Sequence, residues 1–168
     1  LEEMEHFSLD GIDYEAFNTS GGLGTLCESL QGKVQNSHYK TVRYPGHRDI
    51  VKMLIRDLEL GKLERRPILK DVLETSVPMT KQDVVLVFVS VIGTRNGRLE
   101  QESYAKKIYA QEVNGQLLSA IQLTTASGIC AMVDMVVEGK LPQKGMVRQE
   151  QASLADFTAN RFGRYYAL

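Results

Sequence analysis

Apolar residues are densest in the middle of the chain, where positions 84–92 read VVLVFVSVI. Branched and aromatic residues occupy both alternating sets of positions, a pattern typical of a strand covered on both faces. Asn-Gly pairs follow at 96–97 and 114–115. Because a type I′ turn needs positive φ at both central residues, these pairs predict two tight hairpin turns. The pattern therefore predicts a three-stranded antiparallel meander with strands at 84–92, 99–112 and 116–124.

Helical periodicity appears on both sides of this predicted meander. After Pro45-Gly46, apolar residues from Ile50 to Leu58 recur on one face, which predicts a helix that ends near Gly61. Positions 125–138 are apolar nearly all round and are followed by Gly139, a good C′ residue, so we expect a helix buried against the sheet. Ser153 and Asp156 resemble a capping box and predict a third, shorter helix.

The first 45 residues carry extended patterns at 13–17 and 33–44, separated by a glycine-rich turn and a short helix at 23–30. Early alternation of strands and helices, with a later meander, predicts the α+β class. We expect a mixed sheet that contains the antiparallel three-stranded meander, with helices mainly on one face. No repeat and no Pro/Ser-rich linker interrupts the chain, so residues 1–168 are expected to form a single domain.

Composition limits the classes of partner. The chain has 168 residues and a net charge of -1, which gives no overall field to attract nucleic acid or an anionic membrane. Its longest apolar run, at 84–92, is about half of the ~20 residues that span a bilayer. The two cysteines, Cys27 and Cys130, form no CxxC motif or Cys/His cluster, which argues against a disulfide scaffold and a metal site. We therefore expect a cytoplasmic protein that binds neither nucleic acid nor membrane.

The segment Thr19-Ser20-Gly21-Gly22 precedes the first short helix. Hydroxyl groups and glycines in such a place can hold a carboxylate or phosphate at the start of a helix. The spacing is not G-x-G-x-x-G, and no P-loop is present, so the segment does not predict a dinucleotide site. A tight turn with a capped helix accounts for the same residues equally well.

The segment Arg43-Tyr44-Pro45-Gly46-His47 joins a strand end to a turn. An arginine fork can pair with a substrate carboxylate, and an imidazole can accept a proton near neutral pH. From these residues alone, an ordinary helix start is the favoured interpretation of His47.

Four other residues of chemical interest are given structural roles. We expect Cys27 to pack in the core and Asp134 to lie on a solvated edge of its helix. His6 and His38 have no catalytic companions nearby in the sequence and are interpreted as surface or structural residues.

Three segments, AFNTSGGLGTLCESLQGKV, KTVRYPGHRD and QLTTASGICAMVDMVVEGKLPQKGMVRQE, resemble the saccharopine dehydrogenase family. The closest resemblance is to its lysine epsilon-dehydrogenase-like and saccharopine reductase-like members. It covers nearly the whole chain in order, and RYPGH after GGLGT is its most specific part. In that family an N-terminal Rossmann domain binds NAD(P), and the following α/β domain binds the amino-acid substrate and forms the dimer. This sequence resembles the second domain alone.

The resemblance implies roles for particular residues. Thr19, Ser20 and Gly21 match a loop that faces the substrate cleft, and the RYPGH segment matches the domain junction. We therefore assign substrate binding to these three residues and to Arg43 and Tyr44, and catalysis to His47. A βαβ-like crossover is expected to bring the two segments together.

The resulting hypothesis is the C-terminal domain of an NAD(P)-dependent oxidoreductase that acts on the C–N bond of a lysine-type or saccharopine-type amino acid. NAD or NADP would be bound by an N-terminal domain outside this chain, so we expect no cofactor and little activity in the chain alone. A first residue other than Met agrees with a piece of a longer enzyme. The expected partners are the substrate and a second copy. The alternative is a non-catalytic α+β module for dimerisation or ligand sensing.

Overall fold

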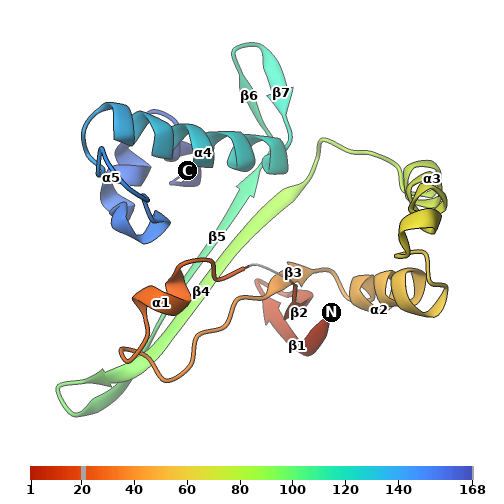
Figure 1. Cartoon of the computed structure of the whole chain (residues 1–168), viewed down its shortest axis with the longest axis horizontal. Helices are drawn as coiled ribbons and strands as arrows, with labels where there is room; N and C mark the ends of the chain where they lie inside the picture. The colour runs from red at the N-terminus through yellow and green to blue at the C-terminus, as the bar shows by residue number, and fades with distance from the viewer. Residues whose placement is uncertain (20–21, 168) are drawn as a thin grey trace. The chain divides into compact units, whose positions relative to one another are not determined.

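The computed structural model describes residues 1–19 and 22–167. The chain divides into two compact units, Leu1–Met79 and Thr80–Leu168, and each unit is described by itself (Figure 1). The expectation of a single domain depends on how the two units assemble, and it stays a prediction.

The first unit contains a three-stranded antiparallel sheet in the order β1-β2-β3. Its strands are β1 (Glu2–Leu9), β2 (Ile12–Asn18) and β3 (Thr41–Arg43). Asp10 and Gly11 connect β1 to β2 with φ of +52° and +74°, as a tight hairpin turn requires. The central strand β2 buries four consecutive residues, 14–17, which form the core of this unit.

One helical element precedes β3, and the others follow it. They are α1 (Leu26–Ser29), α2 (His47–Lys52) with its π-helical continuation Met53–Asp57, a 3-10 turn at Leu63–Arg65, and α3 (Arg66–Ser76). The helix predicted after Pro45-Gly46 is confirmed, whereas α3 was not predicted. The strand expected over 33–44 is wrong in extent, because only Thr41–Arg43 pairs with β2.

The second unit is built from two hairpins and a long helix. Strands β4 (Val84–Arg95) and β5 (Arg98–Tyr109) form one hairpin, and β6 (Gln111–Val113) and β7 (Gln116–Leu118) form the other. Both predicted Asn-Gly turns are confirmed: φ is +53° and +76° at 96–97, and +51° and +77° at 114–115. Local turn chemistry thus sets the register of both hairpins.

The predicted meander at 84–124 is wrong, because the two hairpins are separate sheets. The strand expected to reach residue 124 ends at Leu118. Ser119 and Gln122 then form a capping box, and the Asp83 carboxylate accepts the N–H groups of Ala120 and Ile121 at 2.6 and 3.0 Å. These bonds start helix α4 (Ala120–Val137) within the expected strand.

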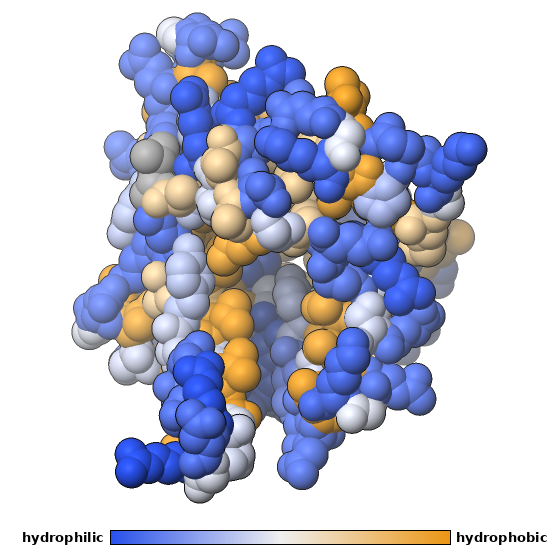
Figure 2. Space-filling model, turned by 90° about the vertical axis from the view of Figure 1, so that its left-hand side faces the viewer, coloured by the Kyte–Doolittle hydropathy of each residue, from blue (hydrophilic) through white to orange (hydrophobic). Residues whose placement is uncertain are grey.

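The α+β class is confirmed, and a three-stranded antiparallel sheet is present, formed by β1, β2 and β3. Every pairing among the described strands is antiparallel, so the parallel pairs of a mixed sheet do not occur among them. The expected covering of 84–92 on both faces is also wrong. Strand β4 pairs with β5 alone, and Val91 and Ile92 are 62% and 64% exposed. Exposed apolar side chains appear as orange areas in Figure 2.

Helix α4 packs on β4 and β5, as expected for 125–138, but it is buried on one face only although its residues are apolar nearly all round. Its buried apolar residues include Leu123, Ala131 and Met135, whereas Ile129 and Val133 are exposed. The helix ends as predicted, with Gly139 at φ +73°. By length and hydropathy α4 could cross a membrane, although seven of its residues are buried inside the unit, as in a core helix.

The C-terminal elements pack on α4. Helix α5 (Leu154–Ala159) is capped as predicted, since the Ser153 hydroxyl accepts the Asp156 N–H at 3.0 Å. Short 3-10 turns occupy Gln149–Gln151 and Gly163–Tyr166. The Tyr166 hydroxyl donates to the Thr124 carbonyl at 2.8 Å, which ties the chain end to the middle of α4.

Asp134 is not on a solvated edge of α4, as the sequence suggested. Its carboxylate is 9% exposed and accepts two bonds from the Arg161 guanidinium at 2.6 and 3.0 Å and one from the Asn160 amide at 2.8 Å. These hydrogen bonds, the one from Arg161 foremost, hold the pKa of Asp134 below its usual range. Asp134 therefore joins α4 to the chain that follows α5.

We predict that Asp134→Asn destabilises the fold at neutral pH and makes its stability less sensitive to acid. A carboxyl group with a lower pKa in the folded state stabilises the fold above its unfolded pKa of ~3.9, and this contribution is lost as pH falls through the folded pKa. Urea unfolding from pH 7 to pH 3 measures both effects. Glu102→Gln, on an exposed β5 carboxylate paired with Arg95, is the matched control and should change neither. Equal unfolding midpoints for wild type and Asp134→Asn would contradict the prediction.

Candidate functional site

Glu15 lies at the centre of the first unit, on β2. The β2–β3 register sets it opposite Arg43, and its side chain is only 2% exposed. Its two carboxylate oxygens accept the N–H groups of Gly46 and Arg48 at 2.8 and 2.5 Å. Glu15 thus satisfies two of the N–H groups that the start of α2 leaves without helical partners.

A glycine is required just before α2. Gly46 has φ +93°, a conformation that residues with a Cβ rarely adopt, and it provides no side chain to cap the helix. Instead, the carboxylate of Glu15, on strand β2, caps the helix. Sequence reasoning treated 13–17 as extended but did not single out Glu15. An acid inside the apolar run Tyr14-Glu15-Ala16-Phe17 was the available signal.

His47 is the first residue of α2 and lies between the two N–H groups that Glu15 accepts. Its ring stacks on Phe17 of β2, with ring centroids 6.3 Å apart and planes inclined by 13°. Partial burial is the main cause that lowers the His47 pKa, the positive charge of Arg43 lowers it further, and Glu15 opposes both. The imidazole is therefore neutral at pH 7 and able to accept a proton.

Arg43 and Tyr44 lie beside His47 on the segment that leaves β3. The Arg43 guanidinium donates to the Val42 carbonyl at 2.7 Å, and it forms no ion pair with any carboxylate in the described part of the chain. Tyr44 is exposed and stacks on the buried ring of Tyr14, with centroids 5.7 Å apart. The Arg43–His47 turn therefore places a guanidinium and an imidazole on the face of the sheet that Glu15 and Phe17 share, and a phenol on the face of Tyr14.

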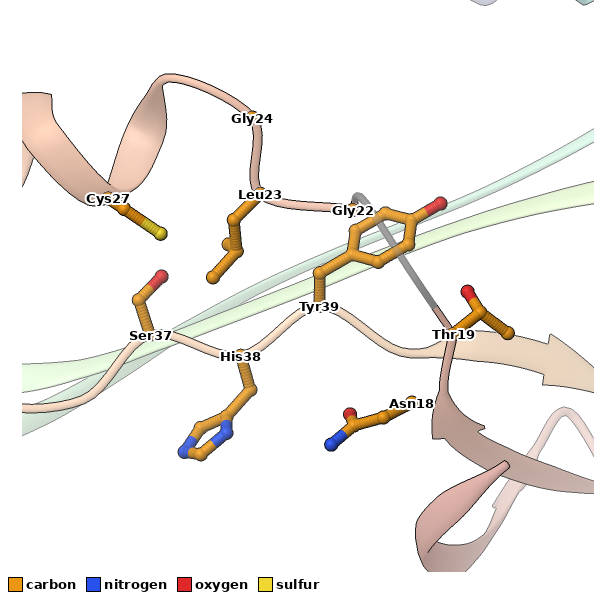
Figure 3. A pocket seen from close by; sticks show the side chains of 9 residues that line it. All are labelled: Asn18, Thr19, Gly22, Leu23, Gly24, Cys27, Ser37, His38 and Tyr39. Atoms are coloured by element: carbon orange, nitrogen blue, oxygen red, sulfur yellow. The ribbon is translucent and has the colours of Figure 1, made fainter.

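The glycine-rich segment forms a different part of the unit. The Thr19 hydroxyl lies 2.8 Å from that of Thr41, and the other two predicted residues, Ser20 and Gly21, lie outside the described residues. A cavity of about 390 Å³ opens here (Figure 3). It is lined by Asn18, Thr19, Gly22, Leu23, Gly24, Cys27, Ser37, His38 and Tyr39. Cys27 is exposed, so its expected core packing is wrong.

The βαβ-like crossover expected to bring the two predicted segments together is wrong. Strands β2 and β3 are antiparallel, with Phe17 opposite Thr41 and Glu15 opposite Arg43, whereas a βαβ crossover needs parallel strands. Thr19 consequently follows one end of this pairing, and His47 follows the other. The cavity includes Thr19 but none of Arg43, Tyr44 and His47. The roles assigned to these residues remain predictions, but they do not share one cavity.

Two described features of the glycine-rich segment do not suit a pyrophosphate. Helix α1 is a single turn of four residues, too short to present a helix terminus to a pyrophosphate. The ring of Tyr39 covers Gly22: a Cβ built there would lie 1.8 Å from the ring's Cδ1 atom (Figure 3). The backbone is therefore not open to a phosphate at this glycine. Within residues 1–19 and 22–167, no group of three or more His, Cys, Asp or Glu side chains could hold a metal ion.

Comparison with known proteins identifies the family. The model of the saccharopine dehydrogenase C-terminal domain matches residues 2–162, nearly the whole chain. Searches of curated proteins and of solved structures found no match. The match confirms the resemblance carried by the GGLGT and RYPGH segments, both of which lie inside the matched range. The chain belongs to the saccharopine dehydrogenase C-terminal domain family.

Proposed function

We propose that this chain is the substrate-binding and dimerisation part of an NAD(P)-dependent oxidoreductase that acts on the C–N bond of a lysine-type or saccharopine-type amino acid. Family membership supports an oxidoreductase, and the Arg43–His47 turn supports the substrate class. The observation that carries the proposal is the His47 imidazole, stacked on Phe17, on the same short turn as a guanidinium that pairs with no carboxylate in the described residues. An amino-acid substrate presents a partner for each group.

The proposed chemistry assigns one task to each side chain. Oxidation of a C–N bond removes a hydride from the amine-bearing carbon, and this requires an amine without its extra proton. His47 would accept that proton, and Arg43 would hold the substrate carboxylate through a bidentate pair. NAD or NADP would serve as hydride acceptor when bound by a separate nucleotide-binding domain, as the family resemblance implies.

A homodimer formed through the β4–β5 hairpin is the second part of the proposal. Phe88, Val89, Val91 and Ile92 are all exposed on β4, which pairs with β5 alone. Apolar strands that expose side chains and unpaired backbone groups are normally covered by a partner. A second copy of the chain would cover the exposed side chains and the unpaired backbone groups of the strand edge.

We predict that His47→Gln in the full-length enzyme lowers kcat roughly a hundredfold, the usual contribution of a general base. In the wild type, kcat/KM should fall as pH decreases through the His47 pKa, which burial holds below the usual value of a histidine, because a protonated imidazole cannot accept the amine proton. The variant should lack this acidic limb. Initial rates with lysine and with saccharopine, with NAD and with NADP, measure both effects.

The control for this experiment is Lys70→Gln, which changes an exposed side chain of α3 outside the proposed site. A full-length wild type that oxidises neither amino acid would favour the non-catalytic module. Wild-type rates in His47→Gln would remove His47 from the mechanism.

We predict that Arg43→Ala raises KM about tenfold to a hundredfold, the loss expected for a charge-assisted hydrogen bond worth ~1.5–3 kcal/mol. Arg43→Lys keeps the charge but loses the fork and should give an intermediate KM. Arg56→Ala removes an exposed guanidinium paired with Glu2 and serves as the control. A KM unchanged by Arg43→Ala would show that another group holds the carboxylate.

We predict that the chain sediments as a dimer at micromolar concentration and that Val91→Lys shifts it to the monomer. A lysine on β4 would bring a charge into the apolar interface. Leu63→Lys, at an exposed position of the first unit, is the control and should leave the dimer intact. Monomeric wild type at this concentration would refute the dimer.

A further inference from the structure

The buried carboxylate of Glu15 has an unusual set of partners. Within the described part of the chain it forms no ion pair with a lysine, arginine or histidine, and its charge is balanced by the N–H groups of Gly46 and Arg48. A carboxylate that is buried with only backbone N–H partners costs more free energy than a local serine or threonine cap, because a hydroxyl cap buries no charge. Capping alone therefore does not explain a glutamate here.

The two N–H groups flank a single residue. Gly46 precedes His47 and Arg48 follows it, so the two bonds hold the Pro45–Gly46 peptide group before the histidine and the His47–Arg48 peptide group directly after it. The same strand also supplies Phe17, two residues after Glu15, as the surface on which the imidazole stacks. Side chains two apart on a strand share a face. Strand β2 thus holds both the backbone of His47 and its ring.

We propose that Glu15 is the positioning residue for His47, holding the imidazole in the orientation in which it accepts the substrate's proton. This inference takes the catalytic role of His47 from the proposed function. The hydrogen bonds and the ring contact that hold His47 do not depend on that function. The charged groups around the imidazole are Glu15 on β2, Arg43 at the end of β3, and Arg48 and Asp49 on α2. Among these, Glu15 is the one that binds the backbone on both sides of His47.

The structural part is tested by NMR on the 168-residue chain. In the wild type, the amide protons of Gly46 and Arg48 should exchange slowly, and a nuclear Overhauser effect should join the rings of His47 and Phe17. Glu15→Gln keeps the side-chain volume but replaces one acceptor oxygen with an NH₂ donor, so the ring contact and slow exchange should both be lost. Glu5→Gln, on an exposed β1 carboxylate, should keep both. Rapid exchange in the wild type, or an unchanged ring contact in Glu15→Gln, would overturn the proposal.

The functional part is tested by a double-mutant cycle in the full-length enzyme. Glu15→Gln should lower kcat roughly a hundredfold, as loss of the base does, but it should lower kcat no further when His47 is already glutamine. An equal loss in both backgrounds would mean that Glu15 acts through general stability, which would refute positioning. If His47→Gln alone has no effect while the NMR results hold, the proposed function fails and the holding role of Glu15 stands.

Discussion

A carboxylate buried at the centre of a sheet constrains the first unit of this protein. Glu15 must keep its two N–H partners, because without them its buried oxygens would have no hydrogen-bond donors. That requirement fixes the start of α2 against β2 and favours Gly46 in its left-handed conformation. It also determines where His47 lies. The geometry of the Arg43–His47 turn is thus a consequence of one side chain on a different strand.

The sequence could predict features governed by neighbouring residues. The turns at 96–97 and 114–115, the capping of α5 by Ser153 and the C′ role of Gly139 each depend on a few adjacent positions, and all are confirmed. Features that depend on distant partners could not be predicted. The bonds from Glu15 to the start of α2 and from Asp134 to Arg161 span 31 to 33 and 27 residues, and no local pattern encodes them. The apolar run at 84–92 suggested a central strand, although such a run does not specify how many partners a strand has.

The candidate site shows the same division between features set by neighbouring residues and features set by distant ones. Sequence and family resemblance indicated the Arg43–His47 turn, and the structure adds the residues that support it, Glu15 and Phe17. The glycine-rich segment was expected to join this turn through a βαβ-like crossover, but β2 and β3 are antiparallel, and Thr19 follows the other end of their pairing. Under the proposed function, this chain supplies the proton acceptor and the carboxylate partner, and a separate domain supplies the hydride acceptor. The cavity beside Thr19 and His38 is the alternative place for a ligand in the same unit.

The central claim, that the Arg43–His47 turn binds the amino-acid substrate, is tested most directly by titrating the isotope-labelled chain with L-saccharopine and with L-lysine. Backbone and histidine-ring NMR signals would be followed at a pH where His47 is neutral. The account predicts saturable shifts at Arg43, Tyr44 and the His47 ring, with smaller changes at the cavity. Shifts confined to Thr19, His38 and Tyr39, or no saturable shift at either place, would contradict it.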